Sequence, residues 1–135
     1  MRTMKTKGEN PKARFGKAKA PFFGIPWSAV AYLGAVMDGG ATKYGAYNYR
    51  ETTITATTYH DAIMRHFLKW ADGEDVDDES GQPHLAHIMA CCALYLDADL
   101  LGMTDDDRNK TGLMAGLLES LATSTSQYRD AYNRD

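Results

Sequence analysis

The sequence predicts an all-α protein of three to four helices. Residues 58–72 and about 82–101 carry apolar side chains at helical spacing, and glycines or prolines stand near the ends of the predicted helices. Residues 52–57 alternate weakly and could form a short strand, but no partner strand is obvious, so an ordered loop is favoured. A chain of 135 residues is long enough for one domain with its own core.

At the N-terminus, residues 1–20 are rich in lysine and show no periodicity, which predicts a basic arm before a single helical domain over residues 21–135. Pro26 suits the first position of a helix, because its missing N–H would be unpaired there in any case. The first helix is therefore predicted over residues 27–38. Gly39-Gly40 is expected to end it, since glycine tolerates the left-handed geometry of a helix C-terminus.

The next segment, residues 40–57, is irregular and contains lysine, tyrosine, asparagine and arginine, which favours a loop that contacts a ligand. The second helix is predicted over residues 58–72. One stripe of this helix faces the core, and it consists of Tyr59, Ala62, Ile63, His66, Phe67 and Trp70. His66 is therefore expected to point inward among apolar neighbours.

The third predicted helix begins near residue 79 or 82 and ends before Gly102. It is apolar on nearly all sides, which is typical of a buried helix. His84 and His87 are three residues apart in this segment, so they are expected to lie on one side of the helix.

A fourth helix is predicted from Thr104, because a hydroxyl followed by the acids at 105–107 suits the positive end of a helix. The helix is expected to reach Leu121 or beyond. The polar tail, residues 122–135, is expected either to fray or to contact another subunit.

The charge is unevenly distributed, although the net charge is only -3. Residues 1–20 carry seven of the 15 lysines and arginines and a single acid, Glu9. Six of the 18 acids lie between Asp72 and Glu79, with no basic residue among them. A protein that binds polymeric nucleic acid needs a basic face to displace counterions, so this class is excluded.

Targeting signals are also missing from the sequence. No run of 18 apolar residues is present, so no membrane-spanning helix and no membrane partner are expected. The basic N-terminus lacks the apolar centre of a signal peptide. The adjacent Cys91 and Cys92 are interpreted as reduced thiols, which agrees with a cytoplasmic protein.

An acidic stretch with the sequence GEDVDDESG occupies residues 73–81 and leads directly into His84 and His87. Carboxylates clustered this densely repel one another unless a cation or solvent lies between them. Mg²⁺ and Mn²⁺ are held by a few carboxylates together with water and substrate phosphates. A metal bound there would reverse the local charge, so even an acidic protein could bind a polyanion. Basic side chains could then hold the remaining phosphate oxygens: Lys43, Arg50 and Arg65.

Other interpretations of these residues remain open. An acidic loop is often simply solvated, and a histidine on a buried face is often a core residue with satisfied hydrogen bonds. His84, His87 and Cys91 could instead ligate zinc from one helix, although a fourth ligand is not evident. The loop tyrosines could pack the loop rather than stack on a base.

Three segments in this order resemble the phage-type dATP/dGTP diphosphohydrolase family, which is related to the MazG-like nucleotide pyrophosphohydrolases. They are the loop GATKYGAYNYR at residues 40–50, Arg65-His66, and the acidic stretch followed by His84-Leu-Ala-His87. The resemblance covers about residues 17–100. Tyr49 is a departure, since tryptophan is expected more often at this position.

The resemblance implies a MazG-like helical bundle that is completed by oligomerisation as a homo-dimer or homo-tetramer. It implies a metal-dependent enzyme, using Mg²⁺ or Mn²⁺, that converts dGTP or dATP to the monophosphate and pyrophosphate. Such an enzyme would serve phage nucleotide-pool metabolism in the cytoplasm of the infected host cell.

MazG-like enzymes usually carry their metal ligands as E-x-x-E on one helix and E-x-x-D on the next. This chain has no E-x-x-E, and Glu74 and Asp77, which have the E-x-x-D spacing, lie in the acidic stretch rather than in a predicted helix. His84-x-x-His87 occupies the spacing of the second pair. The metal ligands expected here are Glu74, Asp77, Glu79, His84 and His87. Glu74 and Glu79 are the candidate catalytic carboxylates, which would orient or deprotonate the attacking water. Substrate contacts are expected from Trp27, Lys43, Tyr44, Asn48, Arg50, Arg65 and His66. The alternative function is a non-catalytic helical module that binds a nucleotide or a metal.

Overall fold

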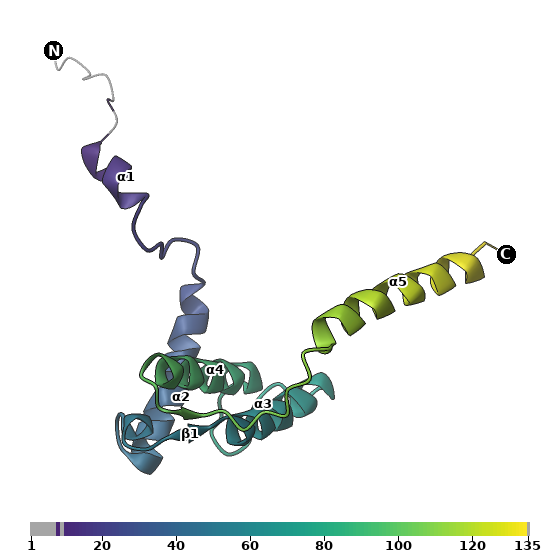
Figure 1. The fold of residues 1–135 in the computed structure, drawn as a ribbon. Coiled ribbons are helices and arrows are strands. Elements are labelled where there is room, and N and C mark those ends of the chain that lie inside the picture. Colours follow the sequence, from purple (N-terminus) through teal and green to yellow (C-terminus); the bar gives the residue numbers. More distant parts are fainter. Residues whose placement is uncertain (1–7, 9, 135) are drawn as a thin grey trace.

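The computed structural model describes residue 8 and residues 10–134, and helices dominate this part of the chain (Figure 1). The helices are α1 (Pro11–Gly16), α2 (Trp27–Tyr44), α3 (Ala56–Ala71), α4 (His84–Leu100) and α5 (Met114–Tyr132), with a 3-10 helix η1 (Asn48–Arg50) and two short strands, β1 (Ile54–Thr55) and β2 (Thr104–Asp105). The predicted all-α class is confirmed.

The centre of the fold is formed by α2, α3 and α4, with α4 in contact with both of the others. The side of α4 that faces them carries small residues, and Ala86, Ala90 and Ala98 are almost fully buried. Small side chains allow helices to approach closely, which explains how three helices pack with few large core residues. We expected this helix to be buried on nearly all sides. In a single copy of the protein this is wrong, since Leu85 and Leu96 are exposed.

The first helix is longer than predicted, because α2 continues through Gly39-Gly40 to Tyr44. Glycine permits a left-handed helix end but does not impose one. Inside a helix, a glycine lowers the stability by only about 1 kcal/mol relative to an alanine. The helix ends where Gly45 adopts a φ of 92°, a conformation that favours glycine. Lys43 therefore lies in the last turn of a helix rather than in a loop.

The weakly alternating stretch at 52–57 contains a real strand, so the loop prediction is wrong for Ile54 and Thr55. Strand β1 pairs in parallel with β2, with Ile54 opposite Thr104. Ile54 is buried, and its N–H donates to the carbonyl of Met103 at 2.9 Å. The partner strand follows α4 in the sequence, so a search of the neighbouring residues could not find it.

The predicted helix start at Thr104 is also wrong, because α5 begins only at Met114. Asp107 nevertheless caps a helix, because it binds the N-terminus of α3. The carboxylate of Asp107 accepts the backbone N–H of Thr57 at 2.9 Å and also the Thr57 hydroxyl. Thr57 is the second residue of α3, so Asp107 provides the capping that this helix terminus requires.

Both ends of the described chain contain helical segments. The basic arm at 1–20 contains the short helix α1, while residues 1–7 and 9 of this arm lie outside the described residues. Helix α5 continues through the predicted polar tail to Tyr132 and extends away from the α2–α4 group (Figure 1). Among the described residues, no helix has the length and apolar character needed to cross a membrane.

Candidate functional site

Three histidines from two helices meet in one cluster. Nδ1 of His66, on α3, lies 2.8 Å from Nδ1 of His84, on α4. The ring of His66 also stacks on that of His87, with centroids 4.5 Å apart and an interplanar angle of 4°. The His84 side chain is fully buried. His66, predicted on the inward stripe of the second helix, therefore belongs to the same cluster as the two histidines predicted on the third helix. The stripe does not stay buried along its whole length, since Phe67 and Trp70 are exposed.

The acidic loop between α3 and α4, residues 72–83, is a folded hairpin rather than a loose solvated segment. The N–H of Asp77 donates to the carbonyl of Gln82 at 2.9 Å, and the N–H of His84 donates to the carbonyl of Asp75 at 3.0 Å. Gly73 and Gly81 have φ values of 101° and 70°, which allow the tight turns at the two ends of the stretch. The hairpin turns Glu74 and Asp77 toward the histidines.

Glu74 fixes the orientation of the buried histidine. Its Oε2 lies 2.7 Å from Nε2 of His84. An ionised carboxylate can only accept hydrogen bonds, so Nε2 of His84 carries the proton and donates it. In the neutral ring, Nδ1 of His84 is then left with a lone pair, and this lone pair faces His66.

Asp77 is a second member of the acidic stretch that lies beside the histidines, whereas Asp75 and Asp78 are exposed. Its Oδ2 accepts the N–H of Ser80 at 3.0 Å and lies 3.6 Å from Nε2 of His87. Burial opposes the ionisation of Asp77, but the hydrogen bonds from Ser80 outweigh it and hold the pKa below its ordinary value. Asp77 is therefore a carboxylate at neutral pH.

Two imidazoles of the cluster, those of His66 and His87, have lowered pKa values that favour the neutral form. Burial lowers the pKa of His66, and the neighbouring His87 and His84 lower it further. Burial also lowers the pKa of His87, although Asp77 opposes the shift. Neutral imidazole is the form that ligates a metal, so the cluster presents ligand-competent groups at physiological pH.

Ligand atoms of His66, Asp77 and His84 lie within 4.8 Å of one another, which is close enough for a single metal ion. The geometry thus brings together three of the residues singled out in the sequence. Cys91, the third member of the zinc interpretation, is not part of this group. Sequence reasoning also missed Ser80, whose hydroxyl lies 2.6 Å from Nε2 of His87.

A cavity of about 810 Å³ adjoins the cluster. It is bounded by the end of α2, the segment around η1, the start of α3 and one side of α4. Its walls include Tyr44 and Asn48, which were predicted to contact the substrate, and Tyr59, which was predicted only as a core residue. His87 lines this cavity and also belongs to the cluster. The volume is within the range of pockets that hold small organic ligands.

Lys43 and Glu79 form an ion pair that connects the end of α2 to the acidic loop. The hydrogen bond to Glu79 raises the pKa of Lys43, so the ammonium group stays charged. Both side chains are largely exposed. Glu79 therefore lies outside the buried group formed by His66, Asp77 and His84.

Arg50 is held by protein groups in this structure. Its guanidinium makes two hydrogen bonds to the carboxylate of Asp97 on α4, at 3.1 and 3.0 Å, and lies over the rings of Tyr47 and Tyr49. Both tyrosines line the cavity. Arg50 is thus placed to fasten the tyrosine segment to α4, whereas its phosphate role remains a prediction.

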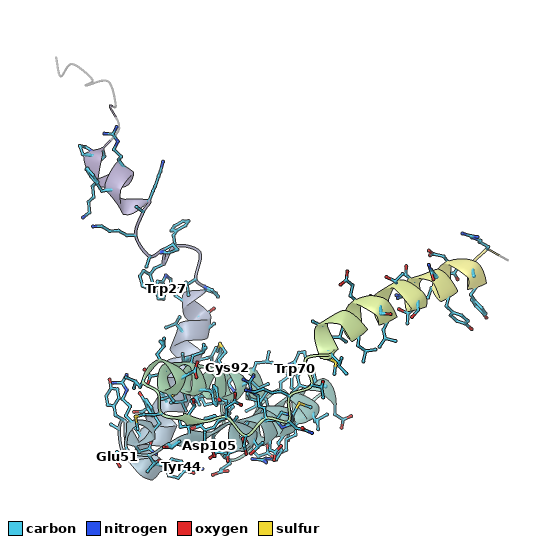
Figure 2. All side chains as sticks on the ribbon, in the orientation of Figure 1. Trp27, Tyr44, Glu51, Trp70, Cys92 and Asp105 are labelled. Atoms are coloured by element: carbon cyan, nitrogen blue, oxygen red, sulfur yellow. The ribbon has the colours of Figure 1, made fainter. Side chains whose placement is uncertain are left out.

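The remaining predicted contacts lie at different distances from the cavity. Arg65 lies on α3, where it is exposed, and it is not among the residues that line the cavity. Trp27 lies at the opposite end of α2 from Tyr44, separated by about 25 Å of helix. Figure 2 shows this separation, and Trp27 does not line the cavity.

Comparisons with known proteins agree with the sequence resemblance. A family model described as "dATP/dGTP diphosphohydrolase, N-terminal" matches residues 9–108. A curated dATP/dGTP diphosphohydrolase of Salmonella phage PMBT28 is 32% identical over 108 residues, which is 78% of this chain. The match spans only 36% of the length of that relative. No solved structure matches the chain. Helices α2–α4 and the cluster lie inside the matched region, whereas α5 lies beyond it.

Proposed function

The chain belongs to the family of dATP/dGTP diphosphohydrolase N-terminal regions, and on this premise we propose that it hydrolyses dGTP or dATP to the monophosphate and pyrophosphate. The observation that carries the proposal is the shared position of His87, which lines the cavity and stacks within the histidine cluster. A base and sugar in the cavity would place phosphates beside potential metal ligands. The role in phage nucleotide pools, within the host cytoplasm, belongs to the same proposal.

We propose a divalent cation as the cofactor, held by His66, Asp77 and His84; Mg²⁺ and Mn²⁺ are the ions that the resemblance implies. The residues fit a cation, because the fully buried side chain of His84 converges with a second imidazole and a carboxylate. When bound, the ion would neutralise phosphate charge and favour the loss of a proton from water. The predicted ligands Glu79 and His87 lie at the edge of this group, and Glu74 touches it through His84.

The other side chains would bind the nucleotide and promote the attack of water. Tyr44 and Asn48 offer a ring and an amide to a purine in the cavity. Lys43 and Arg65 supply positive charge for the non-bridging oxygens. Water attacks the α-phosphorus, the bond between the α- and β-phosphoryl groups breaks, and pyrophosphate leaves. Glu79 is the candidate to orient this water and accept its proton, because its carboxylate is exposed and close to Lys43.

We also propose that the chain works as a homo-oligomer. It exposes 11621 Å², whereas a folded monomer of 14.9 kDa typically exposes about 7,000 Å². Part of the excess is apolar surface on α4 and α5, including Leu96 and Leu117. A second copy that covers this surface would complete the bundle.

The alternative function is a binding module without turnover. It is favoured by the absence of an E-x-x-E pair and by the fact that neither α3 nor α4 carries a glutamate. A module of this kind would gain thermal stability from dGTP or dATP, since ligands that bind the folded state stabilise it. It would release no product with any divalent metal.

A substrate panel tests the proposal. The purified chain would be incubated with each common deoxynucleoside and ribonucleoside triphosphate, in the presence of Mg²⁺ or Mn²⁺, and the products separated by chromatography. We expect equal amounts of monophosphate and pyrophosphate, with dGTP or dATP as the best substrate. Release of inorganic phosphate or of triphosphate would contradict the proposed reaction.

A further inference from the structure

The contact between His66 and His84 joins two ring nitrogens that cannot both be acceptors. Their Nδ1 atoms lie 2.8 Å apart, which is a hydrogen-bonding distance. Since Glu74 holds the His84 proton on Nε2, the Nδ1 of a neutral His84 can only accept. The proton between the rings must then belong to His66. This proton occupies the place that a cation would take if His66 carried its hydrogen on Nε2 instead.

The third donor of the group is a carboxylate with little freedom. Asp77 is tied to the backbone N–H of Ser80 at 3.0 Å, and its side chain is only 15% exposed. The set is therefore two imidazole nitrogens and one carboxylate oxygen, drawn from α3, α4 and the loop between them. Each is positioned by its own helix or by the hairpin before any ion arrives.

Such a set distinguishes between divalent ions. Mg²⁺ takes nearly all of its ligands as oxygens and requires close to octahedral geometry. Imidazole nitrogen suits first-row transition ions, and their affinity for a given nitrogen and oxygen site rises from Mn²⁺ to Cu²⁺ and is lower again for Zn²⁺. Two nitrogen donors out of three protein donors are thus poorly matched to Mg²⁺.

We propose that His66, His84 and Asp77 form a site that selects a first-row transition ion over Mg²⁺, with Glu74 as the residue that positions His84. This inference deepens the proposed function and rests on it for the location of the metal. Glu74 contacts the far nitrogen of His84, so it acts through the ring and is not itself a ligand. A carboxylate bonded to the far nitrogen of a ligating histidine fixes the ring and increases its basicity.

Cobalt(II) titration of the metal-free protein tests the selectivity without any substrate. Bound Co²⁺ absorbs visible light in a way that depends on its ligands, so binding is read directly. We expect one Co²⁺ per chain, which Zn²⁺ displaces and which excess Mg²⁺ leaves in place. Displacement by Mg²⁺ at comparable concentrations, or the absence of a Co²⁺ spectrum, would overturn the inference.

Variants assign the ligands and the positioning residue. His66→Gln is the first choice, because its ring is partly exposed, and circular dichroism would confirm that the chain still folds. We expect it to lose the Co²⁺ spectrum, as would His84→Gln and Asp77→Asn where they fold. Glu74→Gln should weaken Co²⁺ binding by about 10–100-fold while keeping the shape of the spectrum. A changed spectrum in Glu74→Gln would show that Glu74 is itself a ligand.

The control is Asp78→Asn, which removes an exposed acid from the same hairpin. It should bind Co²⁺ as the native chain does. Equal weakening in Asp78→Asn and Glu74→Gln would mean that only the general negative charge of the loop matters, which would overturn the positioning role.

Metal binding and turnover are measured apart, so the two proposals fail separately. Co²⁺ binding with no hydrolysis under any condition would remove the proposed function and leave the site intact. Hydrolysis that depends on Mg²⁺, in a protein that binds no Co²⁺, would remove this inference and leave the proposed function intact.

Discussion

Lys43 in the last turn of α2 forms an ion pair with Glu79 of the acidic hairpin, beside the cavity that Tyr44 and Gly45 line. The pair holds a positive charge and a carboxylate next to one another near the cavity, and in the proposed nucleotide complex both would lie close to the phosphates. In this arrangement Lys43 has a partner before substrate arrives and can exchange it for a phosphate oxygen.

Replacement of Glu79 tests its role in the attack of water. We expect Glu79→Gln to lower kcat by about 10²–10⁴-fold, the range typical of a lost general base. The melting temperature should change little, because exposed ion pairs contribute little to stability. Steady-state kinetics and thermal unfolding measure the two quantities. Asp78→Asn is the matched control, and an equal loss of kcat in this variant would argue against a specific role for Glu79.

The Arg50–Asp97 pair provides a second prediction. If Arg50 holds the tyrosine segment against α4, Arg50→Gln and Asp97→Asn should have similar effects, because either change removes one charge of the pair and disrupts the pair of hydrogen bonds. We expect KM for dGTP or dATP to rise several-fold in each, with a smaller change in kcat. A loss of activity in Arg50→Gln that Asp97→Asn does not reproduce would instead identify Arg50 as a phosphate ligand.

The hydrogen bonds that Asp107 accepts from Thr57 predict that the stability of the folded chain depends on pH. Hydrogen bonds from Thr57 lower the pKa of Asp107 below its ordinary value of 3.8. A carboxyl whose pKa is lower in the folded state stabilises that state above its unfolded pKa, and the contribution disappears as the pH falls through the folded value. We therefore expect Asp107→Asn to melt a few degrees below the native chain at neutral pH.

The difference in melting temperature should shrink as the pH drops below about 4, because the native carboxyl is then protonated as well. Thermal unfolding followed by circular dichroism at several pH values measures this trend. Thr57→Ala should lower stability in the same direction, whereas Asp105→Asn, at an exposed neighbouring position, serves as the control. A difference that stays constant at all pH values would contradict the capping interaction.

The close packing of α4 is tested at Ala86, which is 1% exposed. Because this alanine is almost fully buried, a leucine there is expected to overpack the interface, so Ala86→Leu should destabilise the chain by about 1–3 kcal/mol. Ala71→Leu adds the same side chain at an exposed site near the end of α3, where we expect a change within about 0.5 kcal/mol. Urea denaturation compares the two variants, and equal effects would show that the α4 interface is loosely packed.

Some of this architecture could be predicted because its signals are local. Helical spacing indicated α3 and α4, and the inward stripe of α3 included His66, which does reach the cluster. His84 and His87 were expected on one side of a helix, and both contact His66. Periodicity alone was sufficient for these features, since both helices pack against each other along the predicted sides.

Other features depend on residues far apart in the chain. Ile54 pairs with a strand that follows α4, and Asp107 caps a helix that begins near Thr57, so neither contact leaves a pattern in its neighbourhood. Gly39-Gly40 did not end α2 because glycine allows a helix end without requiring one. The sequence also could not show that Asp77, rather than Asp75 or Asp78, faces the histidines, since this depends on how the hairpin turns.

The most direct test of the central claim is hydrolysis in water labelled with heavy oxygen, followed by mass spectrometry of both products. Attack on the α-phosphorus at this site predicts that the label appears in dGMP or dAMP and that pyrophosphate carries none. The same reaction should be lost in Glu79→Gln and retained in Asp78→Asn. Label in the pyrophosphate, or binding of dGTP and dATP with no labelled product at all, would contradict the account.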